Sequence, residues 1–536
     1  MLQISQLRLP LDYDEAILKG TVLRELRARA QDIVTIKMKQ RAIDARRGNV
    51  EFSCQVLVEV LNEGVMLQRL AGNHRIKLAE PTEYTELDKT KVNMAPVPPE
   101  KRPVIIGTGP CGLLAGLILA RHGRNPLILE RGKPAGDRAR DVMAFWKRGG
   151  DFNPESNVQF GEGGAGTFSD GKLYTQIRDR ENRIPWLLKE LVKAGAPEDI
   201  LYKSRPHIGT DRLIKVVRNM REEIVRMGGE VRFGAHVTDA VIENGKMTKV
   251  ILANGEEILG SPFIFAVGHS ARDTFEMLHR IGVPMEAKGF SVGVRIEHPQ
   301  SLIDRSQYGK WGGHPRLGAA PYKFVAHCDT GRAAYSFCMC PGGLVVAASS
   351  EPGMVVTNGM STYARAESNA NAGFMVDIPA TDFADQGVLG GMAFQRALEK
   401  QAYELGGGGF KAPAQRLGDF MKKQPSSGPG RVQPSYQPGV TWTDLATLLP
   451  DIVTTTLREA VRRVDDMIPG FGLDDAVMTG VETRSSCPLR ILRDPDSLLC
   501  AGIENFYPAG EGAGYAGGIV SAACDGMRVA EKILNG

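Results

Sequence analysis

Hydrophobic residues change their spacing several times along this 536-residue chain. Residues 14–29 have the spacing of an amphipathic helix, while residues 34–46 and 51–60 are typical of strands on either side of the turn signal RGN. The earlier stretch LRLPL also favours a strand. This β-α-β-β order predicts a small α+β domain over residues 1–93, and the proline-rich residues 94–102 predict a linker.

A different pattern begins at Val104, where a short apolar run, a glycine-rich turn, an apolar helix and a second apolar run follow one another. This order is typical of the opening of a parallel α/β sheet. Strand-like runs such as FSVGVRIE and AAYSFCMC then dominate, until a strand, a glycine-rich turn and a helix return near the C-terminus. We therefore expect an α/β, Rossmann-like dinucleotide-binding domain at residues 103–288, interrupted by a β-rich substrate domain at 289–475 and completed by 476–536.

Composition narrows the class of protein. Charged residues make up 24% and hydrophobic residues 42% of the chain, and no apolar run reaches the roughly 20 residues that span a bilayer. A net charge of +4 gives no broad electrostatic footprint for nucleic acid. The eight cysteines are scattered, and the start has no secretory signal. These features predict a cytoplasmic protein in a reducing compartment.

The glycine-rich turn carries the clearest chemistry. Gly107, Gly109 and Gly112 form G-x-G-x-x-G between the first strand and its helix, and Glu130 ends the second strand. In such a turn the glycines allow a tight bend and close approach of a pyrophosphate, and the helix N-terminus favours its negative charge. A carboxylate at the end of the second strand can accept hydrogen bonds from ribose hydroxyls. We expect the neighbours Pro110, Cys111 and Arg131 to belong to the same site.

Several longer motifs resemble those of a known family. FIFAVGHSARD and FYPAGEGAGYAGGI, together with GTGPCGLLAGLILA and VTNGMSTYARAESNANAGF, are similar to segments of glutathione-reductase-type flavoproteins and, more closely, of bacterial uncharacterised FAD-dependent dehydrogenases. The resemblance implies non-covalent FAD. It also implies FAD contacts for Val237 (by its backbone, at the adenine), Gly268, Gly510, Glu511 (at the ribityl or pyrophosphate region), and Gly517, Gly518 and Ile519 (at the flavin pyrimidine ring).

A second glycine cluster, QFGEGGAGTFSDGKL, spans residues 159–173. Glycines there permit positive φ and close ligand approach, and the polar residues after them supply donors and acceptors. We expect flavin contact from Gly164, Gly166, Thr167, Ser169 and Asp170. Lys172 is a candidate catalytic cation near the flavin or an anionic substrate; a solvated surface lysine is the alternative.

Two other residues are weaker catalytic candidates. Cys340 lies in a C-x-C pair with Cys338, which strand alternation would place on one face at a separation unfavourable for a disulfide. Buried core cysteines are the alternative. Arg365 could clamp a carboxylate or phosphate, or serve a structural network. His207 is a further ligand-side candidate, and Asp211 is expected to cap the helix that follows it. The nine histidines have no paired ligand spacing, so we expect no metal site.

These features together predict an FAD-dependent oxidoreductase whose unknown small-molecule substrate binds between the FAD domain and the inserted domain. Only one complete G-x-G-x-x-G is present, so NAD(P)H is expected at most as a transient electron donor. In one alternative, the N-terminal domain recruits RNA or another macromolecule through Lys37, Lys39, Arg41, Arg46 and Arg47. In the other, the chain is a non-catalytic FAD-binding sensor.

Overall fold

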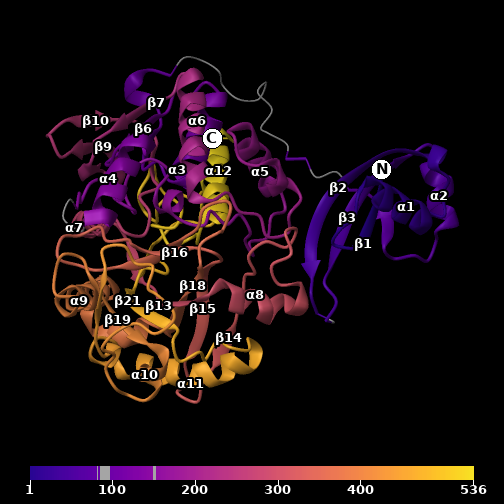
Figure 1. Cartoon of the computed structure of the whole chain (residues 1–536). Coiled ribbons are helices and arrows are strands. Elements are labelled where there is room, and N and C mark those ends of the chain that lie inside the picture. Colours follow the sequence, from indigo (N-terminus) through magenta and orange to yellow (C-terminus); the bar gives the residue numbers. More distant parts are fainter. Residues whose placement is uncertain (47, 81–82, 85–96, 149–151, 536) are drawn as a thin grey trace.

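The N-terminal part of the chain forms a small α+β unit beside the main body (Figure 1). The computed structural model describes residues 1–46, 48–80, 83–84, 97–148 and 152–535. Four antiparallel strands in the order β2-β3-β1-β4 form one sheet. Its elements are β1 (Leu2–Leu9), α1 (Glu15–Leu26), β2 (Ile33–Asp44), β3 (Glu51–Val60), α2 (Glu63–Arg69) and β4 (Ile76–Leu78). The predicted boundary at residue 93 lies outside the described residues, as does Arg47.

This unit contacts the main body through backbone groups. The Arg41 N–H donates to the Tyr202 carbonyl at 2.7 Å, and the Ser204 N–H donates to the Arg41 carbonyl at 3.0 Å. The Arg316 guanidinium donates to the carbonyls of Leu11 and Tyr13. The contact is not only polar, because the buried residues of the unit belong to one hydrophobic cluster with residues of the main body, and Arg41 lies over the ring of Tyr202.

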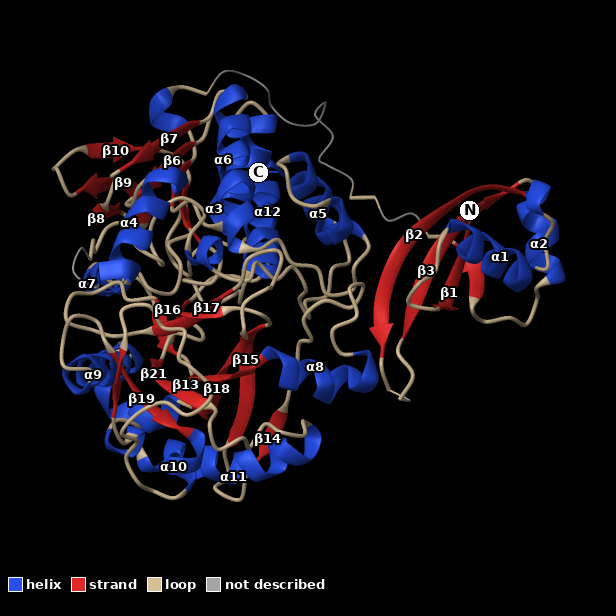
Figure 2. Ribbon diagram, viewed as in Figure 1, coloured by secondary structure: helices blue, strands red, loops and turns tan. Residues whose placement is uncertain are grey.

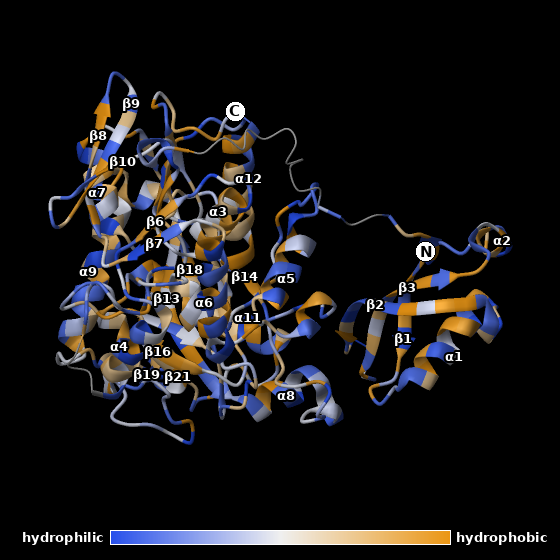
Figure 3. Ribbon diagram, turned by 90° about the horizontal axis from the view of Figure 1, so that it is seen from above, coloured by the Kyte–Doolittle hydropathy of each residue, from blue (hydrophilic) through white to orange (hydrophobic). Residues whose placement is uncertain are grey.

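A five-stranded parallel sheet organises the main body, in the order β23-β11-β5-β6-β7. The runs VII and LILE are buried at every position because helices cover one face of this sheet, and the strands of residues 237–259 together with α7 cover the other. α3 is buried from Cys111 to Ala120 and packs against α12, whose apolar residues stand out in Figure 3. The elements are β5 (Val104–Ile106), α3 (Pro110–Arg121), β6 (Leu127–Glu130), α4 (Ala135–Arg148), α5 (Arg183–Lys193), α6 (Thr210–Arg226), β7 (Glu230–Phe233), β11 (Phe263–Phe265), α7 (Arg272–Arg280), β23 (Phe506–Pro508) and α12 (Ile519–Asn535).

A larger sheet of seven strands forms the second half of the main body, seen below the first in Figure 2. Its order is β14-β15-β18-β13-β21-β19-β20. Its strands and helices are β13 (Phe290–Pro299), α8 (Gln300–Tyr308), β14 (Val325–His327), β15 (Ala333–Cys340), β18 (Asn369–Ile378), α9 (Gly390–Leu405), β19 (Ala412–Arg416), α10 (Leu417–Met421), β20 (Val440–Trp442), α11 (Asp451–Met467) and β21 (Val477–Glu482). The β-rich character expected for this region is confirmed.

The C-terminal boundary of this β-rich region differs from the expected boundary. β21 pairs with β13 and β19 inside the seven-stranded sheet, so the expected boundary at residue 475 falls too early. The reason is that VMTGVE is buried at every position and offers no alternation from which its sheet could be read. Three small sheets complete the fold, from β8 (Val237–Glu243), β9 (Lys246–Leu252) and β10 (Glu257–Leu259), from β12 (Met285–Ala287) and β22 (Leu489–Ile491), and from β16 (Leu344–Ala347) and β17 (Thr357–Met360).

Among the described residues, no helix is long and apolar enough to cross a membrane.

Candidate functional site

The main pocket lies where the order in which strands are added to the parallel sheet reverses. From β5 the chain adds β6 and then β7 on one side, and later β11 and β23 on the other. Such a switch point leaves a crevice at the carboxyl ends of the central strands, which is where open α/β sheets bind ligands. A pocket of about 1460 Å³, including the solvent at its mouth, opens there and is lined by both halves of the main body.

The G-x-G-x-x-G turn forms one wall of this pocket. Gly107 has a φ of +105°, and a Cβ on it would stand 2.5 Å from the Ala266 carbonyl oxygen. A Cβ on Gly112 would stand 2.0 Å from the Gly107 carbonyl oxygen, so both positions require glycine. Gly109 begins α3 without a side-chain cap among the described residues, and Pro110 occupies the first helical position. The helix N-terminus is therefore arranged to receive an anionic group.

Both carboxylate oxygens of Glu130 accept hydrogen bonds from the protein itself. Its Oε2 accepts from the N–H and the hydroxyl of Thr108, at 3.0 and 2.5 Å. Its Oε1 accepts from the N–H groups of Gly132 and Gly161, at 2.9 and 3.0 Å. Four donors fill the hydrogen-bonding capacity of one carboxylate. Glu130 thus lines the pocket and also binds three protein loops together. Its expected contact with a ribose stays a prediction.

The second glycine cluster is held from behind by a buried arginine that the sequence analysis did not single out. The Arg138 guanidinium, in α4, is fully buried and donates to four carbonyl oxygens of the loop, those of Asn157, Val158, Gly161 and Glu162. Burial lowers the pKa of Arg138 to about 10, which still leaves it charged at neutral pH. Because four of its five N–H donors bind backbone carbonyls of this segment, the loop is fixed as a wall of the pocket.

Most of the expected residues in this loop line the pocket: Gly164, Gly166, Ser169, Asp170 and Lys172. A Cβ on Gly164 would stand 3.1 Å from the Gly109 Cα, so the loop lies directly against the phosphate-type turn. Thr167 is placed elsewhere: it is buried and its hydroxyl donates to the Glu162 carbonyl.

The C-terminal motif contributes the opposite wall. Glu511, Gly518 and Ile519 line the pocket, as do Val237, Gly268 and the turn residues Gly107, Gly109, Pro110, Cys111, Glu130 and Arg131. Gly112, Gly510 and Gly517 lie outside the lining; the Gly510 N–H donates to Asp525 at 2.8 Å, which fixes the turn before Glu511. Among the described residues, nothing stands within 4 Å of a Cβ built on Gly109, Gly268 or Gly518. Bare backbone therefore faces open space on three sides of the pocket.

The inner end of the pocket brings together charged groups from both halves. Asp170 is buried and accepts two hydrogen bonds from Arg365, at 2.9 and 2.6 Å, and its Oδ2 is 3.6 Å from Lys172 Nζ. Burial opposes ionisation of Asp170, but Lys172 and Arg365 outweigh it and lower its pKa. Arg365 lies outside the pocket lining and acts on it through Asp170. Cys340 is fully buried and also lies outside the lining, whereas Cys338 is part of it.

His207 and Asp211 support this end from outside the pocket. The His207 Nε2 lies 3.1 Å from the Tyr363 carbonyl oxygen, and the Asp211 carboxylate accepts from the Tyr363 N–H at 2.8 Å. The expected cap of α6 by Asp211 is therefore wrong: the N-cap is Gly209. Asp211 instead holds the strand connection that carries Arg365.

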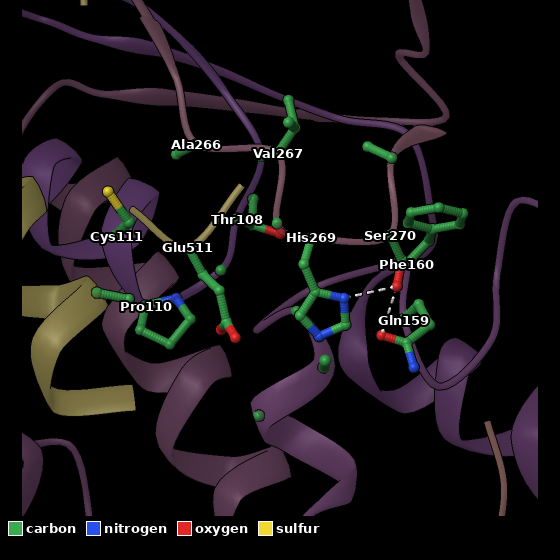
Figure 4. Close-up of a pocket in the computed structure, with 18 of the residues that line it drawn as sticks. Thr108, Pro110, Cys111, Gln159, Phe160, Ala266, Val267, His269, Ser270 and Glu511 are labelled. Carbon is green, nitrogen blue, oxygen red and sulfur yellow. Dashed lines mark hydrogen bonds between the residues drawn. The ribbon is translucent and has the colours of Figure 1, made fainter. Parts of the chain in front are cut away.

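Figure 4 shows two titratable side chains, His269 and Glu511, that project into the pocket from different loops. Ser270 donates its hydroxyl proton to Gln159 Oε1 at 3.1 Å and lies 2.9 Å from His269 Nδ1. Nδ1 therefore carries the proton that Ser270 accepts, and Nε2 is left as an acceptor. Burial and the nearby Arg484 and Arg272 lower the pKa of His269 to about 3, so the ring is neutral at physiological pH.

Glu511 is the acidic partner in this view. Burial raises its pKa to about 7, against the opposing effect of the Gly518 N–H, whose nitrogen lies 3.5 Å from Oε2. A carboxyl group poised near neutrality can take up or release a proton at physiological pH. The sequence placed Glu511 at the site by motif alone; its protonation follows from burial.

Within the described residues, no group of three or more histidine, cysteine, aspartate or glutamate side chains is arranged to hold a metal ion.

The parallel sheet, its switch-point pocket and the glycine turn at α3 define a Rossmann-type α/β fold. Residues 289–485 match a protein family described as FAD-dependent protein, C-terminal domain-like, and residues 1–59 match a domain of unknown function, DUF8436. The chain belongs to the same family as an uncharacterised protein of Clostridium beijerinckii, with 45% identity over 535 residues, or 99% of this chain and 98% of that relative.

Solved structures show a weaker likeness. An L-proline dehydrogenase from P. horikoshii covers 82% of this chain and 94% of its own, at 13% identity and a TM-score of 0.34. The E. coli quinol fumarate reductase FrdA covers 81% and 70%, at 12% identity and a TM-score of 0.35. Scores this low carry no information on function.

Proposed function

We propose that this chain binds FAD non-covalently in the switch-point pocket and acts as an oxidoreductase. The observation that carries the proposal is the bare backbone of Gly109, Gly268 and Gly518 facing one pocket, beside the uncapped N-terminus of α3. Such a cradle suits a long ligand with phosphates, because glycine backbone permits close approach and helix N–H groups bind anions. The match of residues 289–485 to an FAD-dependent family supports FAD over other dinucleotides.

Each wall then has a role. FAD, when bound, supplies the electron-accepting and electron-donating chemistry. The N-terminus of α3 would hold its pyrophosphate, and the N-terminus of α12, at Gly518 and Ile519, would face its flavin ring. Phe337 and Cys338 of β15, with Asn358 of β17, close the inner end from the seven-stranded half, which leaves a substrate position between the two halves. NAD(P)H is proposed as a transient electron donor.

The test is anaerobic reduction of the purified yellow protein. Acid or heat should release intact FAD, and NADH or NADPH should bleach the flavin absorption near its visible maximum. A screen of metabolites for reoxidation then identifies the substrate. A colourless protein that takes up no FAD on reconstitution would refute cofactor binding, and a yellow protein that no donor reduces would support the sensor alternative.

Recruitment of a macromolecule by the N-terminal unit is less favoured. The Arg41 guanidinium lies over the rings of Phe52 and Tyr202, at 4.9 and 5.2 Å from their centroids. Arg46 makes two hydrogen bonds to Asp44, at 2.9 and 2.8 Å, and Lys39 donates to Gln3 at 2.8 Å. These side chains already bind protein groups, and phosphate contacts would have to compete with them.

A further inference from the structure

The inner wall of the pocket is shaped by a bulge in β15. Phe337 pairs with Gly373 and Cys340 with Asn371, so two residues of β15 oppose one residue of β18. Cys338, inside the bulge, has a left-handed backbone with a φ of +41°. Regular alternation would place Cys338 and Cys340 on one face. The bulge instead exposes Cys338 at the pocket and leaves Cys340 buried.

Cys338 differs from every other cysteine of the chain. All eight lie in the described residues, where seven are buried and Cys338 alone is partly exposed. A left-handed backbone is strained at a residue other than glycine and persists where the surrounding structure enforces it, often at functional sites. Here the enforcing contact comes from the fully buried Arg295, which donates to the Cys338 carbonyl oxygen at 2.9 Å.

Positive groups and a thiol donor surround the sulfur. Lys172 Nζ lies 3.9 Å from the Cys338 Sγ. The pKa of the Cys338 thiol lies well below its usual range. A hydrogen bond from Cys340 lowers this pKa most, and the charges of Lys172 and Arg295 lower it further. Burial and Asp170 raise it, but by less. The acidic groups Glu482 and Glu511 also face this sulfur.

The other thiols behave in the opposite way. The pKa of the Cys340 thiol is raised above its usual range, first by the hydrogen bond to Cys338 and then by burial. The same direction holds for the remaining six: Cys54, Cys111, Cys328, Cys487, Cys500 and Cys524. Cys338 is therefore the one cysteine of the eight whose pKa is lowered, and it is also the one that lines the pocket beside Lys172.

We propose that Cys338 is a nucleophilic thiolate of this pocket, paired with Lys172, which adds to a carbonyl-activated carbon of the bound substrate. The proposal deepens the proposed function and rests on the same pocket. In this step the sulfur electron pair forms an S–C bond, and the displaced π pair moves to the carbonyl oxygen or to the conjugated enolate oxygen. Lys172 then gives that oxygen a proton, so no oxidant is consumed.

Two side chains support the carbonyl class of substrate. The Lys172 ammonium lies beside the sulfur, where negative charge develops on oxygen as the bond forms. Asn358 lines the pocket and its Oδ1 already accepts from Arg295 at 2.7 Å and from the Gly359 N–H at 2.7 Å. The amide nitrogen is the end of Asn358 that remains to donate to a ligand oxygen.

N-Ethylmaleimide, a carbonyl-conjugated alkene, tests the proposal on the purified full-length protein. Labelling is followed by mass spectrometry of peptides from pH 6.5 to pH 8.5. An ordinary thiol with a pKa of about 8.5 reacts roughly 50-fold faster at pH 8.5 than at pH 6.5, because its thiolate fraction rises. We expect one label per chain, at Cys338, with a rate that changes less than about threefold. Labelling first at another cysteine, an ordinary thiol profile at Cys338, or recovery of a Cys338–Cys340 disulfide would overturn the proposal.

Variants separate the thiolate from general accessibility. Cys338→Ser should abolish the fast label and Cys328→Ser should leave it unchanged. Lys172→Met should shift the labelling profile to higher pH, whereas Lys172→Arg and the remote Lys249→Met should preserve it. If a variant misfolds by circular dichroism, the wild-type profile still decides. Flavin content, measured by absorbance, is independent: a colourless protein with fast Cys338 labelling refutes only FAD binding, and a yellow protein with an ordinary Cys338 refutes only the thiolate.

Discussion

At the scale of single residues, the hydrogen bonds of Glu130 give it a structural role in the pocket. A carboxylate at the end of the second strand is positioned for a ribose, yet here both oxygens accept from Thr108, Gly132 and Gly161. Three backbone segments of the cofactor cradle therefore depend on one buried side chain, which is 5% exposed. Its contribution is to the shape of the pocket, and a ligand gains from it indirectly.

Glu130→Gln tests this role. The amide presents NH₂ to donors that need an acceptor, so at least one buried N–H loses its partner. We expect the free energy of unfolding of the FAD-free protein to fall by about 2–3 kcal/mol, measured by urea denaturation. Glu243→Gln, at the exposed end of β8, is the matched control. Unchanged stability with weaker FAD binding would show instead that Glu130 binds the ribose directly.

Glu511 predicts a pH dependence. Its pKa in the folded protein is raised to about 7 from an ordinary value of 4.5. The folded state keeps a proton that the unfolded chain has lost, so this stabilisation is complete below pH 4.5 and disappears as the pH rises through 7.

Glu511→Gln should therefore stabilise the FAD-free protein at pH 8 by about 1–2 kcal/mol, since solvent in the open pocket reduces the full effect. At pH 4 the variant and the wild type should have equal stability. Urea denaturation at the two pH values measures the difference, and an equal effect of the substitution at both would show that Glu511 is not protonated near neutrality.

At the scale of elements, the site depends on how two loops stack. The segment after α4 is fixed from behind by Arg138, and its η3 turn (Ala165–Phe168) begins at Gly164, which lies against Gly109 at the start of α3. Positive φ at Gly164 and its short distance to Gly109 both exclude a side chain.

Gly164→Val, compared with a matched control, separates the effect of positive φ from the effect of close contact with Gly109. The added side chain would press on the Gly109 backbone and narrow the pocket, so we expect at least a tenfold loss of FAD affinity with the fold retained. Gly318→Val is the matched control because Gly318 has a similar φ, +66° against +61°, and no described atom within 4 Å of its Cβ position. The control should lose only the roughly 1–2 kcal/mol of backbone strain. Fluorescence titration with FAD measures affinity; equal FAD binding by both variants would remove this loop from the site.

At the scale of the whole molecule, the two halves of the main body meet through a buried ion-pair network. Glu399 of α9 is fully buried and accepts from Arg272 of α7 at 2.7 and 2.8 Å and from Arg484 at 3.1 and 2.8 Å. Arg484 lines the pocket. The same contact that joins the halves therefore also sets the pocket wall.

Glu399→Gln should cost about 3–5 kcal/mol of stability, because it leaves two buried guanidinium groups to share the single, partly exposed carboxylate of Glu351. Glu404→Gln, exposed on the same helix, should change stability by less than about 0.5 kcal/mol. Thermal and urea unfolding measure both. Because the arginines lower the pKa of Glu399, its stabilisation should also disappear as pH falls below 4.5. A Glu399→Gln variant as stable as wild type would mean that the network does not hold the halves together.

The sequence by itself determined the parts of this protein that depend on neighbours along the chain. The G-x-G-x-x-G turn, the second glycine loop and the helix after Gly518 could be predicted, because glycine where positive φ or close approach is needed, together with apolar runs beside it, leaves a local pattern. The β-α-β-β order of the N-terminal unit was predictable for the same reason, although its β1 begins at Leu2, five residues before the expected strand.

Only the tertiary structure decided which side chains meet. Arg138 and Arg484 lie in no motif, and their roles come from carbonyls and carboxylates elsewhere in the chain. His269 lies within FIFAVGHSARD, but only the folded structure shows that its ring projects into the pocket. Strand alternation predicted Cys338 and Cys340 on one face, with Cys340 as the catalytic candidate; the bulge in β15 places Cys338 in the pocket and Cys340 in the core. The physical reason is that burial and charge at a point in space sum over all elements packed there, whereas periodicity along the chain records only one of them.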